Sequence, residues 1–263
     1  KSSIKDGQGA APVERGTVEF KNVSFKYPNA DEYVLKNISF KVNKGEQVAF
    51  IGSTGSGKST LIDLVPRFYD ATEGEVLVDG INVKDYKLEE LYNILGYVSQ
   101  KSILFTGTIN ENVGFGKNKN GKPSEEEIQL AIKQAQAKDF VEKMPDKYNS
   151  HISQGGKNVS GGQKQRLSIA RALARKSEIL IFDDSFSALD YKTDKALRKT
   201  LNKDLKGTTS LIVAQRIGTI KNADQIIVLD NGNMVGKGKH EELLKNCPIY
   251  KEIALSQLSK EEL

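Results

Sequence analysis

Hydrophobic and polar residues alternate along two early segments of the chain, Val18–Tyr27 and Leu35–Val42. Such alternation is typical of antiparallel strands that bury one face. Later in the chain, Ile179–Phe182, Ser210–Ala214 and Gln225–Leu229 are short apolar runs without alternation. Runs of this kind suit strands of a parallel sheet that is covered on both faces. The pattern therefore predicts two different sheets in one α/β chain.

Helical spacing appears between these two groups of strands, from Ser124 to Tyr148. Apolar residues recur there at intervals of three and four, and a serine followed by acidic residues is a helix-start signal. Leu167–Ala174 predicts a second helix. The turn pairs Asp79-Gly80 and Asn231-Gly232 indicate hairpins between short strands. A terminal helix is expected to open near Glu241.

Composition and charge narrow the class of protein. The formal net charge of the 263 residues is +5, with Lys and Arg mixed among Asp and Glu, which argues against a nucleic-acid groove. No apolar run of about 18 residues exists that could span a bilayer. Residues 1–15 form a polar linker without the apolar centre of a secretory signal. One cysteine and two histidines suggest no metal cluster, so any metal is expected to arrive with a ligand.

One glycine-rich segment carries the strongest chemical signal. It follows an apolar strand at Gln47–Ile51 and precedes an expected helix at Thr60–Arg67, an order that disfavours an ordinary glycine turn. Its backbone N–H groups can point at phosphate oxygens at the positive end of the helix. Lys58 is expected to reach the terminal phosphates and Ser59 to hold Mg²⁺, so the sequence predicts binding of Mg-ATP. The matching residues are Gly52, Ser53, Thr54, Gly55, Ser56, Gly57, Lys58, Ser59 and Thr60.

Two further segments add to this site. The run Ile179–Phe182 ends in Asp183, and an acid at the end of such a strand can hold Mg²⁺ through water in phosphoryl transfer. Val159 precedes a second motif that opens the helix ending at Ala174, where a helix N-terminus can form another anion site. The residues of this second motif are Ser160, Gly161, Gly162 and Gln163.

Together these motifs resemble the ABC-type ATPases, and the resemblance runs from about Gly16 to the end of the chain. It implies an α/β fold with a phosphate-loop NTPase core around a parallel sheet and an antiparallel β subdomain. It also implies an inserted α-helical subdomain at about 100–164, within one nucleotide-binding domain at 16–263. The motif at 160–163 matches the family signature, apart from Val159 in place of the usual Leu. In the family this signature contacts the γ-phosphate held by a second, facing domain.

The resemblance also gives roles to residues outside the two main motifs. Tyr27 is similar to the aromatic residue that stacks on adenine. Gln100 matches the glutamine that meets Mg²⁺ and senses the transmembrane partner, and Leu104–Ile109 is similar to a segment of exporters. An exporter domain implies transmembrane domains on the N-terminal side of the full-length chain, a place at the cytoplasmic face of the cell membrane, and no nucleic-acid partner.

Two catalytic positions depart from the family pattern. The usual base, a Glu, is Asp184, which is shorter by about 1.5 Å at most, and a displacement near 1 Å can cost on the order of 10²-fold in rate. The usual switch histidine is Gln215, which donates a hydrogen bond but carries no charge. With Lys58, these residues form the expected catalytic set. The pairing resembles the degenerate-site subunit of heterodimeric bacterial multidrug-type exporters, so we expect slow hydrolysis here and a non-identical partner subunit whose competent site this signature completes.

Two other classes of function stay open beside the exporter domain. A soluble ABC ATPase acting on nucleic acid or ribosomes usually carries two linked domains or a basic extension, and this chain shows neither. A regulatory nucleotide-binding module without useful hydrolysis would explain Asp184 and Gln215. The cargo is not predicted, because membrane segments choose it in the family.

A few residues outside the motifs carry simpler expectations. His240 is expected at the surface where a helix starts, and His151 is given no catalytic role. Cys247 is expected in partly buried packing. Tyr191 and the acids of Glu125–Glu127 are expected at the surface.

Overall fold

The apolar runs without alternation form the centre of a six-stranded sheet, as burial on both faces requires. The computed structural model describes residues 3–118 and 120–258. The strand order is β12-β11-β3-β10-β9-β6, with β12 antiparallel to β11 and the other neighbours parallel. The strands are β3 (Gln47–Gly52), β6 (Leu95–Val98), β9 (Ile179–Asp183), β10 (Thr209–Val213), β11 (Gln225–Asp230) and β12 (Asn233–Gly238).

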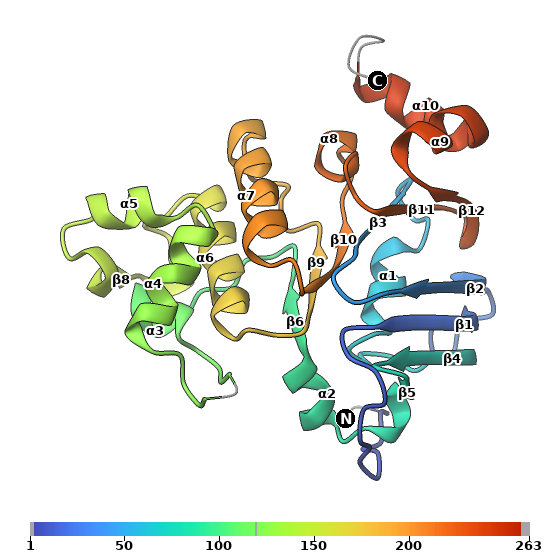
Figure 1. Ribbon diagram of the computed structural model, residues 1–263, viewed down its shortest axis with the longest axis horizontal. Coiled ribbons are helices and arrows are strands. Elements are labelled where there is room, and N and C mark those ends of the chain that lie inside the picture. The colour runs from blue at the N-terminus through green and yellow to red at the C-terminus, as the bar shows by residue number, and fades with distance from the viewer. Residues whose placement is uncertain (1–2, 119, 259–263) are drawn as a thin grey trace.

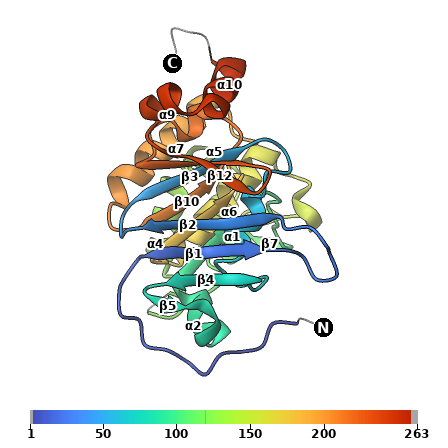
Figure 2. The same ribbon diagram turned by 90° about the vertical axis from the view of Figure 1, so that its right-hand side faces the viewer.

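The alternating segments form a separate antiparallel sheet of order β2-β1-β4-β5, which lies in front in Figure 2. Its strands are β1 (Val18–Phe25), β2 (Leu35–Val42), β4 (Glu73–Val78) and β5 (Ile81–Asn82). Phe20 of β1 is paired with Phe40 of β2, and their rings stack with centroids 4.7 Å apart. This apolar face covers α1 (Lys58–Asp63) and one side of the larger sheet. Strands β4 and β5 pair in antiparallel fashion on either side of Asp79-Gly80, so the predicted hairpin is confirmed.

A mainly helical subdomain projects on the other side of the molecule (Figure 1). It contains α3 (Ile109–Val113), α4 (Glu125–Gln134), α5 (Lys138–Lys143) and the two-stranded ribbon of β7 (Gly107–Thr108) and β8 (His151–Ile152). The helix expected over 124–148 is broken, because Gln136 has a left-handed φ of 64° between α4 and α5. The long helix α6 (Gly161–Ala174) leads back to the large sheet.

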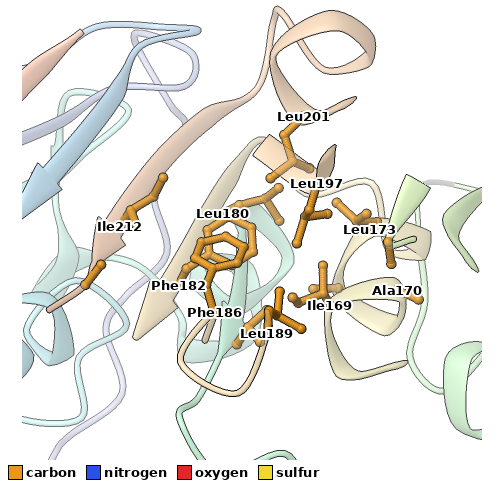
Figure 3. Packing of buried hydrophobic residues seen from close by; sticks show 14 of the residues in the cluster. Ile169, Ala170, Leu173, Leu180, Phe182, Phe186, Leu189, Leu197, Leu201 and Ile212 are labelled. Carbon is orange, nitrogen blue, oxygen red and sulfur yellow. The ribbon is translucent and has the colours of Figure 1, made fainter. Parts of the chain in front are cut away.

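The large sheet has a hydrophobic core on each face. Leu180 and Phe182 of β9 lie in one core, and the alternate residues Ile179 and Ile181 lie in the other. Figure 3 shows the first core, where Ile169 and other residues of α6, together with α7 (Tyr191–Asp204), pack on β9 and β10. This packing fixes the ends of β9 and β10, which carry Asp183, Asp184 and Gln215.

The remaining α-helices of the described residues are α2 (Leu88–Ile94), α8 (Ile217–Ile220), α9 (His240–Asn246) and α10 (Pro248–Gln257). The sequence predicted a single terminal helix where the structure has two. Within residues 3–118 and 120–258, no helix combines the length and apolar character needed to cross a bilayer.

The expectation for His240 was wrong in part. It opens a helix, but it is buried at 3 % exposure, and the hydroxyl of the fully buried Tyr250 is a hydrogen-bond partner for its Nδ1. Glu127 is also more than a surface acid, since it closes the capping box of α4 and pairs with Lys176 at 2.7 Å. Cys247 is buried and Tyr191 is exposed.

Candidate functional site

The loop between β3 and α1 borders a cavity of 240 Å³ at the ends of the parallel strands. Gly55 and Gly57 have left-handed φ angles of 79° and 100°, which turn the backbone around this cavity. A Cβ at Gly57 would stand 2.9 Å from the side chain of Leu35, so only glycine fits there. The lining residues are Thr54, Gly55, Ser56, Gly57, Lys58, Ser59, Thr60, Gln100, Asp184, Val213 and Gln215. Residues far apart in sequence thus meet in one site.

Lys58 holds its ammonium group inside the loop. Its Nζ donates to the carbonyl oxygens of Gly52 at 3.0 Å and Ser53 at 3.4 Å. Burial lowers the pKa of Lys58, and the nearby carboxylates of Asp184 and Asp183 oppose that shift. A cation held in this way is placed to meet a bound anion.

Ser59 and Asp183 lie together, although 124 residues separate them: the hydroxyl of Ser59 donates to Asp183 Oδ1 at 2.9 Å. Hydroxyl and carboxylate oxygens are ligands that suit Mg²⁺. No group of three His, Cys, Asp or Glu side chains within the described part of the chain could hold a metal by itself. These donors therefore fit a magnesium ion that is held jointly with phosphate oxygens.

Tyr97 connects this pair to α1, which the sequence did not indicate. Its hydroxyl lies 3.1 Å from Asp183 Oδ2 and 3.0 Å from Asp63 Oδ1. One phenol proton serves only one carboxylate at a time. Burial raises the pKa of Asp63 to about 6, with the charge of Asp183 adding to the shift. Tyr97 thus fixes the orientation of Asp183 from β6.

Asp184 stands where β9 ends, in a left-handed conformation with φ of 53°. Its N–H donates to the carbonyl of Val213 on β10 at 2.8 Å, which holds the turn. Burial raises the pKa of Asp184, Asp183 raises it further, and Lys58 and Arg216 lower it. The carboxyl group is therefore close to both the loop lysine and the expected metal ligand.

Gln215 follows β10 and lines the cavity, and the next residue ties it to another segment. Arg216 donates to the carbonyl of Phe186 at 2.6 Å and to that of Leu189 at 3.0 Å. It also donates to Asp194 of α7 at 2.8 Å. The buried Asp194 accepts from Arg198 as well, so its charge is fully paired. The loop after β10 is thereby joined to segment 185–190.

Tyr27 lies beside the end of the glycine loop. Its hydroxyl is 2.8 Å from Thr60 Oγ1, and its ring packs edge-on against Phe25 and Tyr69. The structure thus places Tyr27 next to the loop, and its contact with adenine stays a prediction.

The second motif does not line the 240 Å³ cavity but forms a separate exposed edge at the start of α6. Ser160 and Gln163 form a capping box, with reciprocal bonds of 3.2 Å and 3.0 Å. The box leaves the amide groups of Gly161 and Gly162 outside it. A Cβ at Gly162 would lie 3.1 Å from the carbonyl of Ala188, so the motif packs closely on segment 185–190.

Gln165 joins three of these segments, and the motif analysis missed it. Its Oε1 accepts from the N–H of Ala188 at 3.0 Å. Its Nε2 donates to the carbonyl of Gln100 at 3.4 Å and to Ser187 Oγ at 3.3 Å. A polar residue on the buried face of a helix, in step with Ile169 and Ala172, is the signal that could have found it.

The sequence model of the ABC transporter family matches residues 35–187, more than half of the chain. The chain belongs to the ABC transporter family. Among similar proteins, the ATP-dependent lipid A-core flippase of Haemophilus influenzae is 44% identical over 97% of this chain and 43% of its own length. Multidrug resistance protein 1 of Entamoeba histolytica is 44% identical over 92% of this chain and 19% of its own. The ABC domain thus spans less than half of these relatives.

A solved bacterial Atm1-family ABC exporter with ATP bound resembles the ABC domain with a TM-score of 0.89 and 37% identity. The likeness covers 96% of this chain and 44% of that chain. The predicted ABC ATPase fold, with its mixed sheet, antiparallel subdomain and helices, is confirmed. The chain is an ABC-type ATPase domain similar to those of exporters.

Proposed function

We propose that this chain binds Mg-ATP in the loop Gly52–Thr60 and, paired with a second nucleotide-binding domain, powers export of a substrate across a membrane. The observation that carries the proposal is the cavity shared by the loop, Gln100, Asp184 and Gln215. To hydrolyse ATP, these groups must surround one γ-phosphate: the phosphate loop, a ligand of the metal, the catalytic base and the switch residue.

Each lining residue has a role in this proposal. Lys58 and the loop amides neutralise the phosphate charge, and Tyr27 stacks on adenine beside Thr60. Ser59, Asp183 and Gln100 supply oxygen ligands to the magnesium ion, whose charge offsets that of the phosphates. Asp184 accepts the proton of the attacking water, and Gln215 donates a hydrogen bond to the γ-phosphate.

Hydrolysis in this site is slow in our proposal, because both catalytic departures lie in the same cavity. Asp184 is one methylene shorter than the family's glutamate, so its carboxylate reaches the water less well. Gln215 cannot supply the positive charge of a protonated histidine. The site then holds ATP for long periods rather than turning it over.

The exposed motif of Ser160, Gly161, Gly162 and Gln163 serves the other nucleotide. We propose that it meets the γ-phosphate held by a non-identical partner domain, and that this second composite site is competent. Gly161 and the amides at the start of α6 suit an anion approaching from outside the chain.

The relatives' names favour an exporter over a soluble or regulatory module, since they include a flippase and a multidrug resistance protein. We therefore propose transmembrane domains as partners, on the N-terminal side of the full-length chain, and a place at the cytoplasmic face of the membrane.

Replacing the loop lysine tests ATP binding directly. Lys58→Ala removes a charge-assisted contact worth about 1.5–3 kcal/mol, so the Kd for Mg-ATP should rise about 10- to 100-fold. The measurement is calorimetric titration of the 263-residue chain with Mg-ATP. Lys199→Ala, on the exposed side of α7, is the matched control and should bind as the wild type does. Equal affinity for Lys58→Ala and the wild type would contradict the proposal.

A further inference from the structure

The last helix reaches the loop that carries Gln215. Gln257, at the end of α10, donates from Nε2 to the carbonyl oxygen of Gln215 at 2.7 Å. Its Oε1 accepts from the N–H of Ile217 at 2.8 Å. One carboxamide therefore holds the backbone on both sides of Arg216.

These two hydrogen bonds satisfy backbone groups of the loop that have no partner within the helix. Ile217 is the first residue of α8, and the first N–H groups of a helix have no partner within it. The preceding residue, Arg216, gives no side-chain cap. Gln257 caps the helix from another part of the chain, and its donor side takes up the carbonyl of Gln215. Asparagine and glutamine both carry a planar carboxamide with a donor and an acceptor, and glutamine has the longer side chain of the two.

Helix α10 is firmly anchored, so the carboxamide has a fixed base. Tyr250 and Ala254 are both fully buried. Gln257, which is itself exposed, follows Tyr250 by seven residues and Ala254 by three, so it lies on the same side of the helix. The hydroxyl of Tyr250 is also bonded to the ring of His240 in α9. The position of Gln257 is therefore set by the packing of the last two helices.

We propose that Gln257 is a positioning residue for Gln215: it holds the loop after β10 at the distance from which the Gln215 side chain meets the γ-phosphate. This inference rests on the proposed function, in which Gln215 faces that phosphate. Gln257 itself does not line the cavity and touches no reacting atom. Its influence passes through the backbone of residues 215–217, and it couples the last helix to the nucleotide site.

A double-mutant cycle tests this inference, with single-turnover hydrolysis of radiolabelled ATP by excess chain as the readout. Gln257→Ala should slow hydrolysis roughly tenfold, because the loop loses its register. In a Gln215→Ala background, the same change should have no further effect, since the group being positioned is gone. Gln257→Glu keeps the acceptor for Ile217 and loses the donor for Gln215, so it should fall between the wild type and the alanine variant.

Ser256→Ala is the matched control, because its hydroxyl donates only to the carbonyl of Ile253 in the same helix. It should hydrolyse ATP as the wild type does. Hydrogen exchange at the amide of Ile217 gives a second readout, which should quicken in Gln257→Ala and stay protected in Gln257→Glu.

Equal slowing by Gln257→Ala in both backgrounds, or no slowing in either, would overturn the inference. If Gln257→Ala acted only by destabilising the fold, it would slow hydrolysis equally in both backgrounds. The cycle therefore distinguishes destabilisation from positioning. Failure of the proposed function is seen separately, as Mg-ATP affinity that does not depend on Lys58. If affinity depends on Lys58 but Gln215→Ala leaves the Gln257 effect intact, only the positioning role is wrong.

Discussion

Asp184 is held by its surroundings more tightly than a surface acid would be. Its N–H is bonded to Val213, its backbone is left-handed, and its carboxyl lies among Lys58, Asp183 and Arg216. The side chain therefore has little freedom to move outward to a water molecule. Its length decides how far the carboxylate reaches.

Asp184→Glu should raise ATP turnover on the order of 10-fold, because the added methylene restores reach towards the attacking water. The left-handed backbone tolerates Asp better than most residues, so the longer acid should cost about 1 kcal/mol and lower the Tm by about 2–4 °C. Steady-state ATPase assays and thermal unfolding of the same preparations measure both effects. Adding Gln215→His should raise turnover further. Unchanged turnover in the double variant would contradict slow hydrolysis through these two positions.

At the scale of elements, two acids lie where the antiparallel sheet meets the large sheet, and one of them is fully buried. Asp79, just after β4, is fully buried and accepts from the N–H of Thr17 at 3.0 Å. Burial raises the pKa of Asp79, and a hydrogen bond with Glu178, just before β9, raises it further. Arg15 pairs with Glu178 at 3.4 Å, and the Tyr86 ring lies close by. Asp79 thus keeps its proton to a higher pH than an ordinary aspartate does.

This junction makes stability depend on pH. Because the pKa of Asp79 is higher in the folded state, the folded chain binds more protons, and stability falls as pH rises above the ordinary Asp value of about 3.9. Asp79→Asn can keep the bond from Thr17 and donate to Glu178, so it should flatten this loss. Urea unfolding midpoints from pH 5 to pH 8 measure the difference. Asp85→Asn, at an exposed position, is the control. An Asp79→Asn variant as pH-dependent as the wild type would refute this role of Asp79.

The elements that periodicity marks were predicted well, and those without it were not. The ranges of β2 and most of β9 and β11 follow from their apolar patterns, because each buries one or both faces. Helix α7 was not predicted, because Leu197 and Leu201 share its buried face with Asp194 and Arg198, two charged residues that satisfy each other as an ion pair.

Prediction of the site likewise succeeded where residues form a local motif and failed where they act over long distances in the sequence. The glycine loop is a local motif, so its residues and the helix after it could be named from the sequence, although α1 begins at Lys58 rather than Thr60. Gln165 and Gln257 act by bonds to backbone groups of distant segments. Such bonds depend on how the chain folds back on itself, so the sequence can mark Gln165 as a polar residue on an apolar helix face but cannot name the partners of either glutamine.

At the scale of the whole molecule, the two sets of residues that we propose for nucleotide contact lie on different parts of the chain. The cavity of Lys58 and Asp184 belongs to this chain alone, whereas Ser160 and Gly161 are exposed on another edge. Gln165 links the helix of that edge to the segments of Gln100 and Ala188. Few hydrogen bonds thus separate the exposed edge from the segment that carries Gln100.

A charge placed on the exposed edge should separate the two sites. Gly161→Glu has room, since a Cβ there would come no closer than 3.9 Å to Ala188, and its carboxylate would repel a partner's γ-phosphate. In a complex with a subunit carrying the usual glutamate and histidine, turnover should fall on the order of 10²-fold, while this chain's own ATP affinity stays unchanged. ATPase assays of the co-purified pair measure this. Lys58→Ala should slow the pair far less, and an equal loss from both variants would refute the division between sites.

The left-handed turn at Asp184 also has an evolutionary consequence. Aspartate is among the few residues that occupy this backbone region readily. A lineage that exchanged a longer acid for aspartate here would gain folding stability as it lost catalytic power. Selection removes only variants that fall below the function and stability they need. Where a partner subunit performs the hydrolysis, selection for folding stability favours this exchange and selection for activity does not oppose it. The two subunits of such a pair would therefore diverge in their catalytic residues and seldom regain the lost acid.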